Sequence, residues 1–285
     1  MAKSKKTKHA KPSSKHPYRK PSREIPKSKA ATSTPRPRQA TIPFSASDRI
    51  LLVGEGDFSF ATSLLKTHTF TSLLATSFDI LPTLTAKYPQ GASNLESLTA
   101  AAPAVQVLHG VDATKLGKGN GGGGKKIRQS GPYDKIVFNF PHTGGLTTDV
   151  ERQIRANQEL LVGFLRSCVD GHLLRGKGEE EEVWEDDGEQ GKSKAGSVLV
   201  TLFEGDPYER WNIRDLARHV GLRVRESFKF PWEAYPGYAH RRTGGNESGG
   251  KNGWKGEERN ARTYVFEIGN PVAPVARKRE GEDDD

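Results

Sequence analysis

Near its start the chain carries a short apolar strand that runs directly into a glycine-spaced turn. The run Arg49–Phe60 reads RILLVGEGDFSF, so that Gly54 and Gly56 follow the strand and precede an amphipathic stretch. In an open α/β sheet the ligand lies beyond the carboxyl end of such a strand, where glycines allow a tight turn and a close approach of the backbone. The pattern therefore predicts a nucleotide-binding turn between a first strand and a first helix.

This turn is acidic. Glu55 and Asp57 lie inside it, and Ser59 occupies the position at which a dinucleotide fingerprint has its third glycine. Carboxylates would repel a pyrophosphate, whereas they suit a ligand with cationic groups. S-adenosylmethionine carries an ammonium and a sulfonium, so we favour it as the cofactor. A dinucleotide-dependent oxidoreductase is the less favoured alternative.

Strands alternate with helices from about residue 45 onward. Apolar runs predict seven strands, at 49–53, 72–78, 105–108, 133–140, 197–202, 222–230 and 263–268. The connection between the last two strands lacks an apolar helical pattern, so these strands are predicted to be antiparallel. The order predicts an α/β, Rossmann-like class I methyltransferase fold, in which helices flank a seven-stranded, mostly parallel sheet with an antiparallel last strand.

Charge and composition divide the chain into a domain and two tails. Residues 1–40 hold 13 lysines and arginines against the single Glu24, while the whole chain has a formal net charge of +9. We expect a disordered basic tail that contacts RNA and directs import into the nucleus and nucleolus, although a merely solubilising tail remains an alternative. The predicted division is a tail at 1–44, a methyltransferase domain at 45–270 with flexible insertions at about 117–130 and 175–195, and a disordered charged tail at 271–285.

Some classes of protein are disfavoured by composition. No apolar stretch approaches the roughly 20 residues of a membrane span. The single Cys168 has no partner for a disulfide within the chain, and a helical core position in a reducing compartment is expected for it. Scattered histidines with one cysteine give no zinc-binding pattern, so no metal is expected. We expect a monomer without a membrane partner.

Two acidic residues follow the second and third predicted strands. Asp79 lies 23 residues after Gly56, close to the separation of about 20 that a ribose-binding carboxylate has in this fold. Asp112 follows the third strand and could bind the adenine amine, although either aspartate could instead cap a helix. The predicted cofactor-binding residues are Gly54, Glu55, Gly56, Asp57, Phe58, Asp79 and Asp112.

The fourth strand ends in the sequence Asn-Phe-Pro-His, at the sheet edge where transfer chemistry is expected. The Asn139 carbonyl could accept a hydrogen bond from the target base, and Phe140 could stack on that base. His142 could act as a base near neutral pH, or could be an ordinary loop residue. The predicted catalytic residues are Asn139, Phe140 and His142.

A loop that begins near residue 230 mixes aromatic residues with arginines and glycines. Rings that stack on bases and guanidinium groups that bind phosphates suit a single-stranded or flipped nucleotide. The alternative is an exposed loop whose aromatic residues are fixed to the domain. The predicted RNA-binding residues are Tyr235, Tyr238, His240, Arg241 and Arg242.

Four ordered motifs resemble those of the fungal large-subunit rRNA (uridine-N3)-methyltransferase family. They are GEGDFSFA at 54–61, DAT at 112–114, NFPH at 139–142, and YPGY followed by HRRT within 235–243. The resemblance covers about residues 48–268. It implies S-adenosylmethionine as donor, N3 of a uridine in 25S rRNA as acceptor, large-subunit rRNA or a pre-ribosomal particle as partner, and a nucleolar location. A methyltransferase with another substrate and a ribosome-assembly factor without catalysis are the alternatives.

Overall fold

One mixed sheet organises the part of the chain that can be described. The structure is a computed structural model that describes residues 40–70, 72–119, 123–144, 148–176, 195–243 and 259–269. The strands are β1 (Arg49–Val53), β2 (Ser72–Thr76), β3 (Val105–Leu108), β4 (Lys135–Asn139), β5 (Ser197–Phe203), β6 (Leu222–Lys229) and β7 (Ala261–Ile268). Their spatial order is β3-β2-β1-β4-β5-β7-β6, and β7 runs antiparallel to both of its neighbours. The fold class predicted from the sequence is confirmed.

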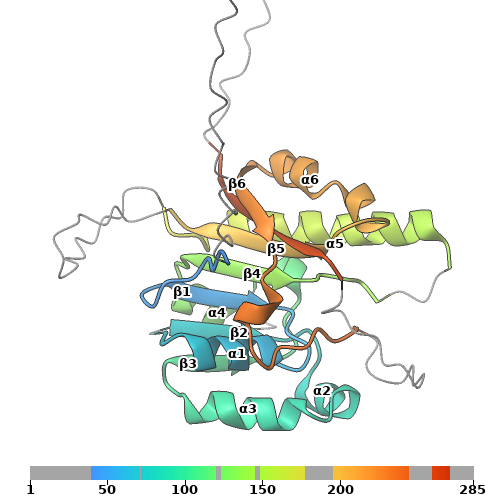
Figure 1. Ribbon diagram of the computed structural model, residues 1–285. Helices are drawn as coiled ribbons and strands as arrows, with labels where there is room; N and C mark the ends of the chain where they lie inside the picture. Colours follow the sequence, from blue (N-terminus) through green and yellow to red (C-terminus); the bar gives the residue numbers. More distant parts are fainter. Residues whose placement is uncertain are drawn as a thin grey trace, which may run out of the picture. The chain divides into compact units, whose positions relative to one another are not determined.

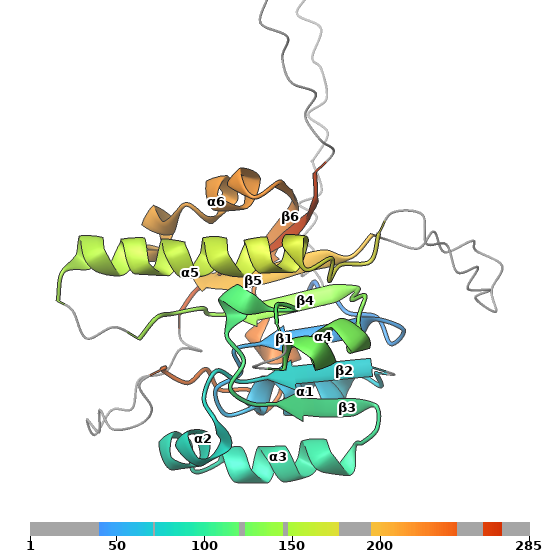
Figure 2. The same cartoon turned by 180° about the vertical axis from the view of Figure 1, so that it is seen from behind.

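Helices cover both faces of this sheet (Figures 1 and 2). They are α1 (Ser59–Thr67), α2 (Leu81–Lys87), α3 (Gly91–Ala100), α4 (Gly124–Ser130), α5 (Val150–Asp170) and α6 (Ile213–His219). Because side chains alternate along a strand, β1 divides between two cores. Ile50 and Leu52 join the cluster that contains α1, whereas Leu51 and Val53 join the cluster that contains α5. Burial on both faces explains why residues 50–53 of β1 are all apolar.

The region predicted as a flexible insertion at 117–130 is corrected in its second half. Residues 124–130 form α4, and its Ile127 is fully buried in the core beside α5. The Tyr133 hydroxyl donates to the Ile127 carbonyl over 2.8 Å, which ties the helix to the start of β4. The segment is rich in glycine and lysine, and the only apolar side chain in α4 that packs into the core is that of Ile127. Most of the other predicted insertion, and both tails beyond residues 40 and 269, lie outside the described residues.

The strand order reverses direction between β1 and β4, which are parallel neighbours. In α/β sheets such a reversal leaves a crevice at the carboxyl ends of the two strands, because their following connections leave toward opposite sides. Val53 pairs with Phe138 at this edge, so the glycine turn after β1 and Asn139 at the end of β4 meet there. None of the helices in the described ranges has both the length and the apolar character needed to cross a membrane.

Candidate functional site

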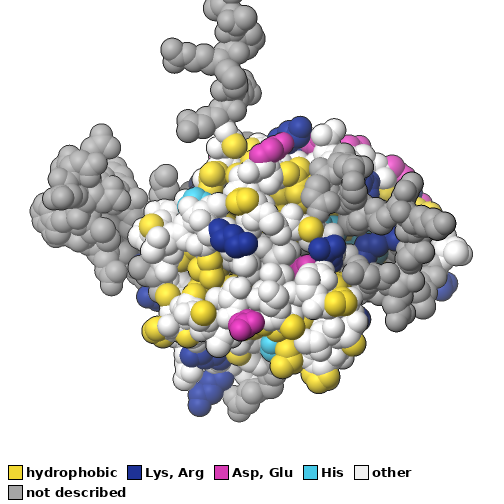
Figure 3. Space-filling view, turned by 60° about the horizontal axis from the view of Figure 1, so that its bottom comes forward, with side chains coloured by type: hydrophobic (Ala, Val, Ile, Leu, Met, Phe, Trp, Pro, Cys, Tyr) yellow, Lys and Arg dark blue, Asp and Glu magenta, His cyan; other side chains and the backbone are white. Residues whose placement is uncertain are grey.

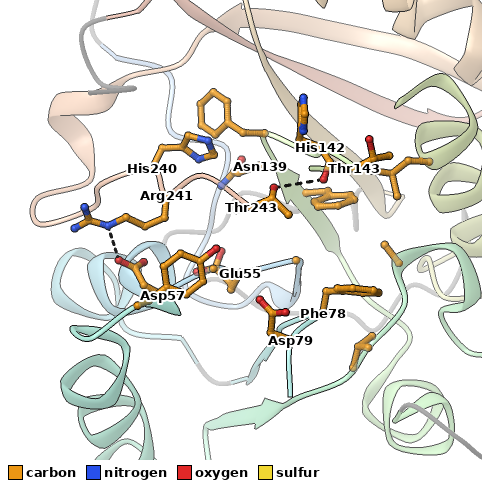
Figure 4. A pocket seen from close by; sticks show the side chains of 18 of the residues that line it. Glu55, Asp57, Phe78, Asp79, Asn139, His142, Thr143, His240, Arg241 and Thr243 are labelled. Carbon is orange, nitrogen blue, oxygen red and sulfur yellow. Dashed lines mark hydrogen bonds and ion pairs between the residues drawn. The ribbon is translucent and has the colours of Figure 1, made fainter. Parts of the chain in front are cut away.

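A cavity of about 300 Å³ lies where the crevice is expected (Figure 4). The loops after β1, β2, β3, β4 and β6 form most of its wall, and Tyr88 after α2 and Leu160 of α5 also line it. All but three of the residues predicted as functional line it. They are Gly54, Glu55, Gly56, Asp57, Asp79, Asp112, Asn139, Phe140, His142, Tyr238, His240 and Arg241.

Three predicted residues have other surroundings. The Phe58 ring is fully buried and meets the ring of His109 edge-on, at 5.6 Å between centroids. Tyr235 is 3% exposed and packs against Phe60 in the core. Arg242 has an exposed side chain, and it is the backbone carbonyl of this residue that accepts a hydrogen bond, from Tyr88. Phe58 and Tyr235 thus support the wall from behind.

Position 54 requires a glycine, both because of its backbone conformation and because of the neighbouring Phe138 ring. Its φ is +71°, a conformation that L side chains rarely adopt, and an added Cβ would lie 2.4 Å from Cε2 of Phe138. The next amide, of Glu55, donates to the carbonyl of Thr76 over 2.8 Å. The turn is therefore held between the ends of β4 and β2, with its backbone facing the cavity.

The Asp57 carboxylate accepts hydrogen bonds from several segments of the cavity wall. This carboxylate is 3% exposed and accepts from the backbone and hydroxyl of Ser59, at 3.0 and 2.6 Å. Gln90 Nε2 and Arg241 Nε each donate to its other oxygen over 2.9 Å. Asp57 thus joins the glycine turn to the start of α3 and to the loop after β6. Its charge is used mainly to position these elements around the cavity.

Among the acidic residues that line the cavity, Glu55 has a strongly shifted pKa. Burial raises the pKa of its carboxyl from the usual 4.5 to about 8. The Ala61 amide, which donates to Oε2 over 3.3 Å, partly opposes this rise in pKa, and the Asp57 carboxylate adds to it. A cationic ligand beside Glu55 would reverse the effect, since an opposite charge favours the ionised form.

The raised pKa of Glu55 predicts a pH-dependent stability. Between about pH 5 and pH 8 the unfolded chain has released this proton and the folded chain still holds it, so the free energy of unfolding falls as pH rises. We expect the fall to amount to about 1–3 kcal/mol, and Glu55→Gln to remove it. Urea denaturation across this range measures it, with Glu96→Gln on the exposed face of α3 as the control. Equal pH slopes for the wild type and Glu55→Gln would contradict the assignment.

The two aspartates after β2 and β3 differ in their environments. Asp79 accepts from the Lys87 ammonium at 2.8 Å and does not cap α2, whose N-cap residue is Ile80. Asp112 does cap the short 3₁₀ helix that follows it, by accepting from the amide and hydroxyl of Thr114. Burial alone would raise the pKa of Asp112, but these hydrogen bonds and the Lys115 ammonium lower it overall. Asp112 therefore both caps the 3₁₀ helix and lines the cavity.

Asn139 has one satisfied and one unsatisfied amide atom. Its Oδ1 accepts from the Thr201 hydroxyl over 2.8 Å. Its Nδ2 is buried and has no hydrogen-bond partner among the described residues. A buried donor without a partner costs about 1–3 kcal/mol, so such a group is usually satisfied by a ligand or by water.

The two other residues predicted as catalytic are constrained by their neighbours. The Phe140 ring stacks on Trp232, with centroids 5.3 Å apart and planes 11° apart. His142 Nδ1 accepts from the Gly144 amide over 2.9 Å. Burial lowers the pKa of His142, and the Arg242 guanidinium lowers it further. The imidazole is therefore neutral near pH 7, with its proton on Nε2.

The loop after β6 is fastened across the cavity. The Tyr88 hydroxyl donates to the Arg242 carbonyl over 2.8 Å, and Thr243 donates to the carbonyl of His142 over 3.4 Å. His240 packs between Phe140 and the neighbouring aromatic residues, and burial lowers its pKa to about 3. The aromatic cluster thus consists of rings that already contact one another.

Several lining residues were not predicted. Tyr88 and Thr243 hold the covering loop, and Phe78 lines the cavity although 68% of its surface is exposed. The position of Phe78 directly before Asp79 could have indicated it. Tyr88 gave no such signal, because it follows a short helix whose sequence has no functional motif. In the described ranges no group of His, Cys, Asp and Glu residues is placed to hold a metal ion.

The arrangement suits a ligand with positive charge and a flat ring. Three carboxylates, from Asp57, Asp79 and Asp112, border the cavity together with the Glu55 carboxyl group, whose raised pKa keeps it mostly protonated near pH 7 until a cation is bound beside it. In Figure 4 Glu55, Asp57 and Asp79 lie in the lower half of the view, and Asn139, His142 and His240 lie in the upper half. The cavity therefore has acidic side chains on one side and the unsatisfied amide donor of Asn139 on the other.

Comparison with known proteins identifies related chains. Residues 51–242 match the family described as "BMT5-like: rRNA (uridine-N3-)-methyltransferase BTM5-like". The 25S rRNA (uridine(2634)-N(3))-methyltransferase of Saccharomyces cerevisiae is 33% identical over 256 residues, which are 79% of this chain and 74% of the yeast protein. Heavy metal-associated isoprenylated plant protein 41 of Arabidopsis thaliana is 33% identical over 71% of this chain and 34% of its own length. The mouse ferredoxin-fold anticodon-binding domain-containing protein 1 homolog is 31% identical over 67% of this chain and 27% of its own length.

Proposed function

Since this chain belongs to the BMT5-like family of rRNA (uridine-N3-)-methyltransferases, we propose that its cavity binds S-adenosylmethionine beside a uridine of large-subunit rRNA. When bound, the cofactor supplies a methyl group on a sulfonium, and uridine N3 receives this group once its proton has left. The observation that carries the proposal is the acidic cavity at the ends of β1 and β4, whose wall contains the family's ordered motifs.

The residues present fit this cofactor. Its ammonium and sulfonium require negative surroundings, and Glu55 offers a carboxyl group whose pKa is raised by burial, so that a cation beside it would favour the ionised form. Gly54 and Gly56 leave the backbone of the turn open to the cavity. We assign the methionine part of the cofactor to this turn, the ribose to Asp79, and the adenine to Asp112.

The N3 proton passes to water in this proposal. His142 is poorly suited to take it, because Nδ1 already accepts from the Gly144 amide and the pKa of the ring is lowered. His240 is a weaker base still, with its pKa near 3. The role that remains for His142 is to donate from Nε2 and to shape the cavity.

Contacts with RNA are proposed to centre on the loop after β6. On the face shown in Figure 3, Lys and Arg side chains are dispersed among apolar and uncharged ones. Tyr238, His240 and Arg241 line the cavity and would lie nearest to the target nucleotide, with Arg242 exposed beside them. The basic residues at 1–39 lie outside the described part of the chain and remain predicted contacts with large-subunit rRNA or a pre-ribosomal particle. A nucleolar location and a monomeric state belong to the same proposal.

Methyl transfer to rRNA provides the test. The protein is incubated with methyl-labelled S-adenosylmethionine and undermodified yeast large-subunit rRNA, and labelled nucleosides are identified by mass spectrometry. We expect 3-methyluridine with the wild type. Asp79→Asn should weaken cofactor binding on the order of tenfold, because a hydrogen bond to a charged acceptor is lost. Glu96→Gln, an exposed change on α3, should bind the cofactor normally. Cofactor binding without any labelled nucleoside would favour another substrate or a requirement for the pre-ribosomal particle, and no cofactor binding at all would favour the assembly-factor alternative.

A further inference from the structure

Three side chains form a hydrogen-bonded row across three neighbouring strands. Asn139 of β4 pairs in register with Thr201 of β5, and Thr201 pairs with Thr263 of β7. The Thr201 hydroxyl donates to Asn139 Oδ1 over 2.8 Å and lies 2.9 Å from the Thr263 hydroxyl. Thr201 is 1% exposed and Thr263 is 3% exposed, so water does not compete for these bonds. In this arrangement Oδ1 is the atom of the Asn139 amide that contacts the row, and Nδ2 lies on the other side of the amide.

The other end of this amide is left for a ligand. Nδ2 is a buried donor without a partner among the described residues, and Asn139 lines the cavity. Such a group needs an acceptor from whatever fills the cavity. The sequence predicts that the Asn139 carbonyl accepts from the base. In the structure this oxygen accepts one hydrogen bond, from Thr201, and Nδ2 is the amide atom without a partner among the described residues.

Uracil offers acceptors where cytosine offers a donor. In uracil N3 lies between two carbonyl oxygens, O2 and O4, and both gain negative charge as the N3 proton leaves. A fixed N–H donor at O4 stabilises that charge as it develops. Cytosine has an amino group at this position, which would oppose the donor. Because cytosine N3 already carries a free lone pair, an enzyme that methylates N3 of uridine needs a device that rejects cytosine.

Building on the proposed function, we propose that Asn139 selects uracil by donating from Nδ2 to O4, and that Thr201 and Thr263 hold the amide in the orientation that makes this possible. Asn139 contacts the base, whereas the two threonines act as positioning residues. The competing use of Nδ2 is a contact with the carboxylate of the cofactor, and the experiment below separates the two.

The experiment compares two RNA transcripts. One is a segment of yeast 25S rRNA that contains uridine 2634, the position named for the yeast relative, and the other has cytidine at this position. The products 3-methyluridine and 3-methylcytidine are measured by mass spectrometry, and cofactor affinity is measured by calorimetry. The variants are Asn139→Asp, which keeps the Thr201 contact but turns the free donor into an acceptor, and Thr201→Val. Thr201→Ser retains the hydroxyl and serves as the matched control.

We expect Asn139→Asp to lower the rate on uridine by about 10²-fold and to raise 3-methylcytidine relative to 3-methyluridine. Thr201→Val should lower the preference for uridine about tenfold with cofactor affinity nearly unchanged, and Thr201→Ser should keep the preference. An unchanged preference in Asn139→Asp and Thr201→Val would overturn the inference. Loss of cofactor affinity in Asn139→Asp at an unchanged preference would assign Nδ2 to the cofactor instead. A wild type that forms no 3-methyluridine would overturn the proposed function itself.

Discussion

Asp57→Ala is expected to lower the free energy of unfolding by about 3–5 kcal/mol and to abolish methyl transfer. The substitution removes an acceptor shared by four donors, from Ser59, Gln90 and Arg241. It leaves the guanidinium of Arg241 without its counter-charge at the edge of the cavity. Because these donors come from three different segments, the glycine turn, α3 and the loop after β6 all lose their common anchor.

Chemical denaturation and calorimetry with S-adenosylmethionine check the Asp57→Ala prediction. The matched control is Asp215→Ala, which removes an acid that pairs with Arg218 on the exposed surface. Exposed pairs contribute little, so this control should change stability by less than about 1 kcal/mol. If Asp57→Ala were as stable as Asp215→Ala and still bound the cofactor, Asp57 would not be the anchor of the site.

The sheet could be predicted because its signals are local. The apolar run at β1, the glycines after it and the acids after β2 and β3 each lie within a few residues of one another, and a parallel sheet brings strand ends together without further information. The antiparallel end of the sheet followed from the absence of a helical pattern between β6 and β7. The helix α4 escaped prediction because only Ile127 in it is apolar.

The partners within the site could not be predicted because they are distant in sequence. Asp57 is predicted to contact the cofactor and does line the cavity, but no local signal indicates that its carboxylate also accepts from Gln90, 33 residues away, and from Arg241, 184 residues away. The direction of the Asn139 amide depends on Thr201, 62 residues further on. Residue type indicates that a side chain can bind, whereas the fold decides which of its atoms remains available.

Gly54→Ala and Gly56→Ala are expected to differ in their effects: the first should lower the stability of the fold, and the second should weaken cofactor binding in a stably folded protein. At Gly54 the φ of +71° disfavours any side chain, and the new Cβ would lie 2.4 Å from Phe138. The Phe138 ring cannot withdraw easily, because it packs against Phe164 at 5.0 Å. Backbone strain and overpacking together predict a loss of about 2–5 kcal/mol of stability. Cofactor binding should be lost with it.

Gly56→Ala should behave differently. The added Cβ would lie 3.6 Å from carbon atoms of Arg241 and Tyr88, which is ordinary contact, and the backbone is outside the left-handed region. Stability is therefore expected to stay within about 1 kcal/mol of the wild type. The methyl group would nevertheless stand on the wall of the cavity, so S-adenosylmethionine should bind on the order of tenfold more weakly, as one misplaced group in a close-fitting pocket costs about 1–3 kcal/mol. Urea denaturation and calorimetry on the two variants measure both effects. Normal cofactor affinity in a stably folded Gly56→Ala variant would place the ligand away from the turn. The assignment of the methionine part of the cofactor to this turn would then be wrong.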